Sequence, residues 1–225
     1  MRGKVRPFLI VTAVLFGLFN VLYFSTLRSR HLRWGATDAE LNASLPGDDL
    51  LAGVNGGVTH AITIHAAPEK IWPWLMQIGQ DRSGFYSYTP LENLFGCEMP
   101  KVERIVPQWP ARRVGETVWF ATPKHYHGQA RMITAVVQPG HAFVMTSPSD
   151  WERLQAGRPG QEGTWAFTLA PVADGQTTRL IARTRGPSPE TLTGRIASVL
   201  FWEPAHFIME RKMLFTIKKL AESNS

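Results

Sequence analysis

The sequence predicts an α+β protein: an antiparallel sheet of about seven strands and a long C-terminal helix, preceded by one N-terminal transmembrane helix. Three observations predict this arrangement. An uncharged apolar run of 21 residues lies near the N-terminus, short segments with period-two alternation fill the middle of the chain, and apolar residues recur at helical spacing near the C-terminus.

The apolar run from Pro7 to Leu27 has the length of a membrane span. At about 1.5 Å rise per residue it matches a hydrocarbon core of about 30 Å, and a helix satisfies its own backbone hydrogen bonds in lipid. A cleaved signal peptide is the alternative, but the run is long and no small-residue cleavage site follows it. We expect a single-pass membrane anchor within residues 1–33. Basic residues flank both ends about equally, so the side of the membrane that holds the domain stays open.

The formal net charge of +6 belongs to that anchor. Residues 1–33 contain six basic and no acidic side chains, whereas residues 34–225 contain equal numbers of both. Basic residues beside a membrane helix favour anionic headgroups. A domain without net positive charge lacks the usual attraction for polyphosphate, so we expect no nucleic-acid partner. Cys97 is the single cysteine, which excludes an intrachain disulfide and a cysteine-rich zinc site.

Residues 34–57 are rich in Gly, Asp and Asn and are expected to form a linker. Thr37 and Glu40 have the spacing of a capping box, which predicts one helical turn there. Residues 58–225 then form one domain.

Its first strand covers residues 58–64, where Val58, His60, Ile62 and Ile64 share one face. Residues 68–78 have helical spacing, with a proline in the first turn and Pro73 as an expected kink. A glycine-punctuated loop with three aromatic residues, 79–88, precedes a short helix at residues 89–95.

Six further strand-like segments follow, separated by turn residues such as Pro139-Gly140. They cover residues 102–106, 117–121, 129–137, 142–147, 164–170 and 178–184. After Pro204 a long helix is expected to run to about residue 222. Its apolar stripe consists of Met209, Met213, Ile217 and Leu220.

Four sequence strings are typical of one protein superfamily. They are APEKIWPWL at 67–75, GFYSY at 84–88, LENL at 91–94 and MERKML at 209–214. With the order of elements, they resemble the SRPBCC or START-like helix-grip superfamily, which includes Bet v 1-like and polyketide cyclase/dehydrase-like proteins, and within it a bacterial membrane-anchored branch. The resemblance covers roughly residues 59–222. It implies a curved sheet wrapped on the C-terminal helix around an apolar cavity that holds, or chemically converts, lipids, sterols or polyketides.

Such a cavity would be lined by aromatic and methionine side chains with a few polar groups. The alternative is that the same side chains pack a solid core. The candidate ligand-binding residues are Trp74, Phe85, Tyr86, Tyr88, Trp119, Trp165, Phe167, Arg183, Met209 and Met213.

Catalytic candidates are few, because no motif in this sequence matches one that contains a catalytic residue of the polyketide cyclases. A carboxylate buried among apolar walls acquires a raised pKa and can act as an acid or base, which makes Glu92 a candidate together with Tyr88. Glu92 could equally form a structural ion pair with an arginine. His125 and His127 could share a metal ion, with His141 or Glu116 as a third ligand. Their segment has the composition of a turn, so surface histidines, with no metal or other cofactor, are expected.

Two function classes follow. The first is membrane-tethered binding of a hydrophobic small molecule, such as a lipid or polyketide-like compound, in an internal cavity. The alternative is a cyclase, dehydratase or hydrolase acting on such a ligand. A tethered scaffold with a filled interior is the third hypothesis.

Overall fold

A computed structural model describes residue 17 and residues 23–54, 56–173 and 175–223. Most of the expected span from Pro7 to Leu27 therefore lies outside the described residues. Within the described part of the chain, no helix combines the length and apolar character needed to cross a bilayer.

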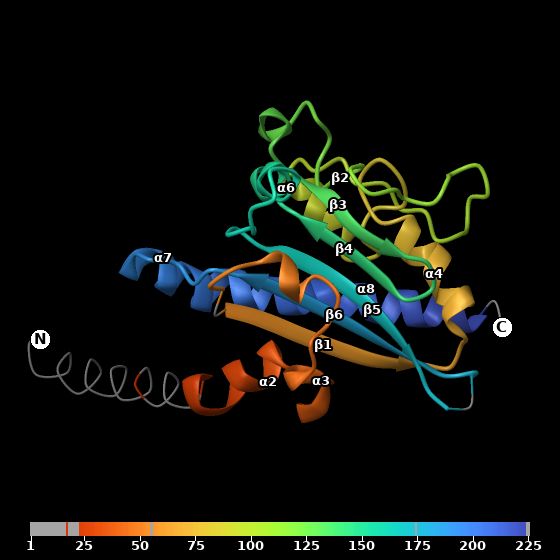
Figure 1. Cartoon of the computed structure of the whole chain (residues 1–225), viewed down its shortest axis with the longest axis horizontal. Coiled ribbons are helices and arrows are strands. Elements are labelled where there is room, and N and C mark those ends of the chain that lie inside the picture. Colours follow the sequence, from red (N-terminus) through yellow and green to blue (C-terminus); the bar gives the residue numbers. More distant parts are fainter. Residues whose placement is uncertain (1–16, 18–22, 55, 174, 224–225) are drawn as a thin grey trace, which may run out of the picture.

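One six-stranded antiparallel sheet forms the centre of the fold, with strand order β1-β6-β5-β4-β3-β2 (Figure 1). Its strands are β1 (Gly56–Ile64), β2 (Thr117–Trp119), β3 (Arg131–Gln138), β4 (Ala142–Thr146), β5 (Thr164–Pro171) and β6 (Thr178–Gly186). The prediction of a seventh strand at residues 102–106 is wrong. The backbone there pairs with a side chain instead: Gln77 accepts from Val106 N and donates to Arg104 O.

Helices α8 (Glu203–Ser223) and α4 (Pro68–Met76) cover one face of the sheet. Phe167, Leu180 and Leu214 are buried between these layers. The stripe of α8 that faces the sheet includes Met213 and Ile217, as expected. The antiparallel sheet and the long C-terminal helix agree with the predicted helix-grip arrangement. Along each strand, residues that face the helix alternate with residues on the opposite face of the sheet.

Shorter helical segments connect these elements. They are η1 (Tyr23–Leu27), α2 (Arg28–Leu32), α3 (Asp38–Asn42), η2 (Asp48–Leu50), α5 (Thr89–Leu94), η3 (Tyr126–Gly128), α6 (Pro148–Gln155), α7 (Leu192–Ala197) and η4 (Ser198–Trp202). Helix α6 was not predicted. Its signal is Ser147, whose hydroxyl accepts from Asp150 N and caps the first turn, with Pro148 as the first helical residue.

Trp34 lies at the β1 edge, where its carbonyl oxygen accepts from Ala61 N, and the residues after it lie against the opposite face of the sheet. The predicted capping box of Thr37 and Glu40 is confirmed and begins α3. Arg179 on β6 donates two hydrogen bonds to the Glu40 carboxylate. The segment predicted as a linker is therefore bound along the sheet, and we call residues 34–54 the N-terminal strap.

Candidate functional site

A cluster of polar side chains interrupts the apolar layer between the sheet and α8. His60 lies on the core face of β1, and His206 and Glu210 lie one turn apart on α8. His60 is completely buried and Glu210 is 3% exposed, whereas the His206 side chain keeps 32% of its surface exposed. We call these three residues the inner cluster. It connects the buried interior to the surface through a single imidazole.

Hydrogen-bond donors surround the Glu210 carboxylate. Trp165 donates its indole N–H to Glu210 Oε1 at 2.6 Å, and His60 Nδ1 contacts Glu210 Oε2. His206 Nε2 lies 3.5 Å from the same Oε2. His60 Nε2 lies 2.6 Å from the carbonyl oxygen of His31, which can only accept, so Nε2 carries a hydrogen and donates. The position of His60 is thus fixed from both sides.

Glu210 and His206 change each other's protonation. Burial alone would raise the pKa of Glu210, but His206 and His60 hold it well below its ordinary value. Burial disfavours the charged form of His206, but attraction by Glu210 raises the pKa of His206 above its ordinary value. Opposite charges at this distance favour each other's ionised form. The arrangement is therefore a buried carboxylate that favours the protonated form of a partly exposed imidazole.

Aromatic rings enclose the buried end of this cluster. The ring centroid of Phe207 lies 5.6 Å from that of His60, and the ring centroid of Trp34 lies 6.2 Å from that of His60. His31 stacks on Phe207 at 5.7 Å. Because Trp34 and His31 belong to the N-terminal region, that region closes the cluster on one side.

A chain of aromatic contacts forms the opposite wall. The Phe85 ring lies 4.8 Å from Phe120 and is stacked on Trp165 at 5.7 Å. Trp165 in turn contacts Phe167 at 5.0 Å and His206 at 6.3 Å. Phe85, Trp165 and Phe167 were predicted to line a cavity, and the structure brings them together. Trp165 contacts both Phe85 and Phe167, and it is the member of this wall that touches the inner cluster.

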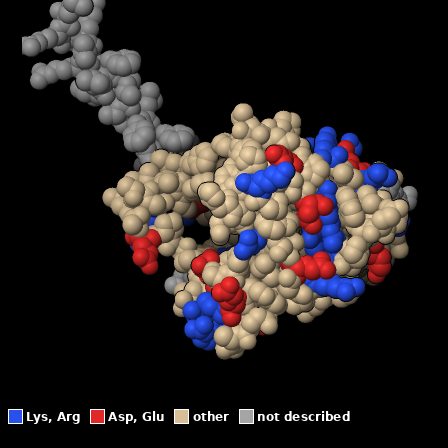
Figure 2. Space-filling view, turned by 90° about the horizontal axis from the view of Figure 1, so that it is seen from above, with Lys and Arg blue, Asp and Glu red and all other residues tan. Residues whose placement is uncertain are grey.

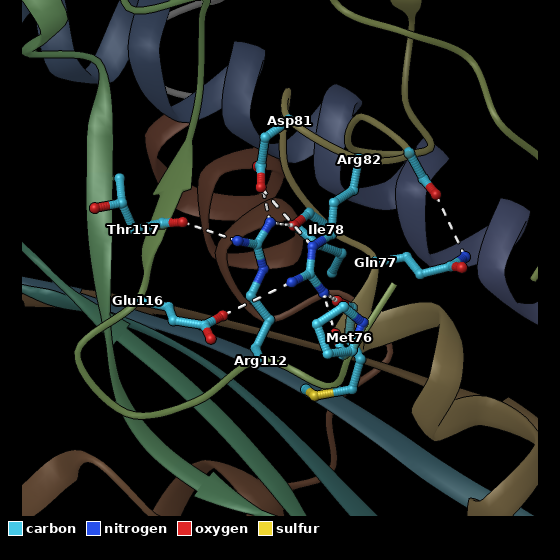
Figure 3. Close-up of polar contacts among 10 residues, drawn as sticks. Met76, Gln77, Ile78, Asp81, Arg82, Arg112, Glu116 and Thr117 are labelled. Carbon is cyan, nitrogen blue, oxygen red and sulfur yellow. Dashed lines mark hydrogen bonds and ion pairs between the residues drawn. The ribbon is translucent and has the colours of Figure 1, made fainter. Parts of the chain in front are cut away.

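Two buried arginines hold the loop that carries Phe85 (Figure 3). Arg112 donates to Ile78 O, Thr117 O and the Asp81 carboxylate, each at 2.8 Å. Arg82 donates to Met76 O at 2.7 Å. Within the loop Gly84 has φ +76°, and a Cβ there would lie 2.5 Å from Pro100 O, so a side chain would not fit. The position of the aromatic wall is thus determined by this network.

The other predicted ligand-binding residues lie in different places. Trp74 and Tyr86 pack together in the core, where the Tyr86 hydroxyl donates to Trp74 O. Trp119 lies under the Arg131 guanidinium, 5.6 Å from its centre. Met213 is 1% exposed, and Met209, half-buried, accepts from the Ser87 hydroxyl at its backbone oxygen.

Arg183 does not point toward the space between the sheet and α8. It lies on the outer face and donates to Asp48, Thr59 and backbone oxygens of the N-terminal strap. The expectation that it reaches a cavity is corrected for a simple reason. Along β6 it alternates with Ala182, whose side chain is in the core, so Arg183 must face the other side.

Glu92 is a second titratable group in an apolar setting. It is 6% exposed, and within the described part of the chain its Oε2 atom has no hydrogen-bond partner. Burial raises the pKa of Glu92 to about 7. Tyr88, the other catalytic candidate, is 42% exposed, and its ring centroid lies 6.0 Å from Lys212 Nζ.

The described hollows lie on the surface. One, of about 570 Å³, is lined by Thr26, Ser29, Arg30, Arg33, Trp34 and Gly35. The other, of about 240 Å³, is lined by Leu41, Gly56, Gly57, Thr59, Arg183 and Arg185 on the outer face. Figure 2 shows an opening in the upper face of the molecule with acidic and basic side chains at its rim. The predicted enclosed cavity thus has no counterpart among the hollows described, and the aromatic wall is accessible at its Trp165–His206 end.

The inner cluster was not among the residues predicted from sequence. Its signal was present: His60 shares a strand face with Ile62 and Ile64, and Glu210 shares a helix face with Met213. When a strand and a helix each carry one polar residue at a position that is otherwise apolar, the two polar side chains are expected to pair with each other in the core. The histidines weighed instead, His125 and His127, are both exposed, as expected, and His125 Nε2 lies 3.1 Å from Glu98 Oε1.

No family model and no curated protein matches the chain. Solved structures similar to it include norcoclaurine synthase from Thalictrum flavum, with 15% identity over 80% of this chain and 93% of that chain and a TM-score of 0.37. A Polyketide_cyc-like protein from Corynebacterium glutamicum has 15% identity over 74% and 85%, with a TM-score of 0.32. Aha1 from Colwellia psychrerythraea has 18% identity over 73% and 99%, with a TM-score of 0.36. Because the TM-scores are low, the fold assignment rests on the sheet order and on α8.

Proposed function

We propose that the protein binds a hydrophobic small molecule, of lipid or polyketide-like character, where His206 reaches the surface, while a membrane helix within residues 7–27 tethers it to a bilayer. The observation that carries this proposal is an exposed apolar ridge on α7 and η4, which continues directly into the turn of α8 that holds the inner cluster. The ridge consists of Leu192, Ile196, Leu200, Phe201 and Trp202.

The exposure of the ridge supports a membrane-facing surface. Leu192 is 73% exposed and Trp202 is 65% exposed. Contiguous apolar side chains at a protein surface mark contact with another apolar phase, and tryptophan is enriched at bilayer interfaces. Helix α7 projects beyond the end of the sheet, so the ridge is free to meet such a phase (Figure 1).

The position of the N-terminal region supports the same orientation. The Tyr23 hydroxyl donates to Val199 O at 2.7 Å, which places η1 beside the ridge. Arg28 pairs with Glu203 through two hydrogen bonds and holds α2 against the start of α8. Since η1 is the last part of the predicted span, the ridge and the end of that span lie on the same side of the domain.

The aromatic wall supplies the binding surface. His206 follows Trp202 by about one helical turn and contacts Trp165. A ligand that leaves the bilayer along the ridge meets the partly exposed Trp165 ring and the His206 imidazole. Apolar walls with a few placed polar groups are the usual composition of small-molecule sites.

The test uses the full chain in lipid nanodiscs, with native mass spectrometry for co-purifying molecules and titration with a fluorescent fatty-acyl probe. We expect saturable binding, weakened about tenfold, or 1.4 kcal/mol, by Trp202→Ser and by His206→Gln. The control is Phe95→Ser, another exposed aromatic residue, 59% exposed and outside the ridge. Absence of both a co-purifying molecule and saturable binding would overturn the ligand proposal, and equal binding by all variants would overturn its location.

The raised pKa of Glu92 favours a second candidate function, acid–base catalysis on such a ligand by a cyclase, dehydratase or hydrolase. A carboxyl that titrates near neutral pH can both give and take a proton at physiological pH. A substrate turned over by the wild type should be turned over at least about 100-fold more slowly by Glu92→Gln, because positioned acid–base groups contribute roughly 10²–10⁴-fold. Unchanged turnover would remove this role.

A further inference from the structure

The inner cluster has the composition of a metal site. We propose that His60, His206 and Glu210 bind one divalent transition-metal ion of the zinc class. This inference is independent of the hydrophobic ligand, because it depends only on three side chains that β1 and α8 bring together.

The three ligand atoms converge. One nitrogen from each imidazole and one carboxylate oxygen all lie within 4.8 Å of one another. Zinc binds imidazole nitrogen at about 2.0–2.1 Å and carboxylate oxygen at about 2.0–2.2 Å, so two ligand atoms of one tetrahedral ion lie about 3.4 Å apart. Side-chain adjustments of less than about 1 Å therefore bring all three atoms around an ion.

The surrounding hydrogen bonds select the ligand atoms. His60 donates Nε2–H to His31 O, which leaves Nδ1 directed at the cluster. Trp165 donates to Glu210 Oε1, which leaves Oε2 directed at both histidines. Metal-binding histidines typically donate their second ring N–H to a carbonyl or carboxylate, and metal-binding carboxylates are themselves hydrogen-bonded. Two of the three ligands already have such partners.

The proton between His60 Nδ1 and Glu210 Oε2 is the competitor of the ion. Metal ligation requires neutral imidazoles and an ionised carboxylate, so binding releases to solvent both that proton and any proton on the His206 nitrogen that faces Glu210. The ion then takes the place of these protons and stabilises the same three side chains with bonds to each.

Access is through His206, whose side chain is 32% exposed while its two partners are buried. Three protein ligands leave a fourth position of a tetrahedral ion open, which distinguishes this site from a closed structural zinc site. Water, or an oxygen or nitrogen atom of a small molecule, would occupy the fourth position.

The experiment treats the full-length protein, purified in mild detergent, with a chelator and then titrates it with Co²⁺, followed by competition with Zn²⁺. We expect one Co²⁺ per chain, with visible absorption bands of a low-coordinate site that Zn²⁺ abolishes. His206→Ala should weaken binding about 100-fold or more, and Trp165→Phe, which keeps all ligands, should weaken it about 10- to 100-fold. His125→Ala, at an exposed histidine paired with Glu98, is the matched control and should bind as the wild type does.

Circular dichroism checks that each variant is folded, and Glu210→Gln replaces His206→Ala if the latter is not. A folded wild type without saturable Co²⁺ bands would overturn the proposal. Full binding by both His206→Ala and Glu210→Gln would also overturn it, as would loss of binding in His125→Ala alone, which would locate the ion at the surface instead.

Discussion

The two faces of the sheet both bury ionic groups, but in different ways. On the outer face the Arg183 guanidinium is 5% exposed and donates to Asp48 at 2.6 Å and to strap carbonyl oxygens. On the inner face Glu210 lies between His60 and the half-exposed His206. Arginine stays protonated at any physiological pH, whereas histidine gains and loses a proton near neutrality. The outer group can only hold the strap, while the inner group can respond to protons, metals or ligands.

The largest effect is expected on the outer face. Arg183→Met should lower the free energy of unfolding by about 3 kcal/mol, because it removes a buried guanidinium with its hydrogen bonds and leaves Asp48 with Arg185 as its charged partner. Chemical denaturation measures the loss. The matched control is Arg179→Met on the same face of β6, whose pair with Glu40 is more exposed and should account for only about 1 kcal/mol. Equal losses at both positions would contradict a special role of Arg183.

Glu210→Gln sharpens the comparison on the inner face. It removes the charge that accepts from Trp165 and both histidines while keeping the size of the side chain, so we expect a loss of about 2–3 kcal/mol. The same denaturation experiment measures it. A variant as stable as the wild type would show that the carboxylate is dispensable for folding.

Glu92 gives a third, smaller and pH-dependent effect. Its pKa is raised to about 7 in the folded protein, from an ordinary value near 4.5. Between these values the unfolded chain has released this proton and the folded chain has not, so the Glu92 contribution to stability falls as pH rises from 4.5 to 7. The difference in unfolding free energy between Glu92→Gln and the wild type should therefore be more favourable to the variant at pH 8 than at pH 4. We expect a change on the order of 1–3 kcal/mol, since one pKa unit is about 1.4 kcal/mol. Thermal unfolding of both proteins over this range measures it, and a difference independent of pH would be contradictory.

The sequence predicted the elements with regular patterns. All five strands after β1 were expected close to their observed bounds, because alternation and glycine turns determine them locally. Residues 102–106 alternate in the same way but form no strand. Their backbone groups bond to the Gln77 side chain, a contact between positions far apart in the sequence that no local pattern encodes.

The candidate site was harder to predict because it depends on which face of each strand packs against which face of α8. The aromatic wall was expected, since Phe85, Trp165 and Phe167 are large apolar residues that must be buried somewhere. Arg183 was assigned to the wrong face although its alternation with Ala182 places it outside. The inner cluster needs the register of α8 against β1, which brings His60 and Glu210, 150 positions apart, into contact.

The ionisation of His206 tests the central claim most directly, that Glu210 favours the protonated form of a partly exposed imidazole at the surface end of a buried cluster. An NMR titration of the His206 ring in chelator-treated full-length protein measures it. The account predicts a pKa above the ordinary value of 6.5, raised by the charge of Glu210 against the opposing effect of burial, and a lower pKa in Glu210→Gln. A His206 pKa at or below 6.5 that Glu210→Gln leaves unchanged would contradict it.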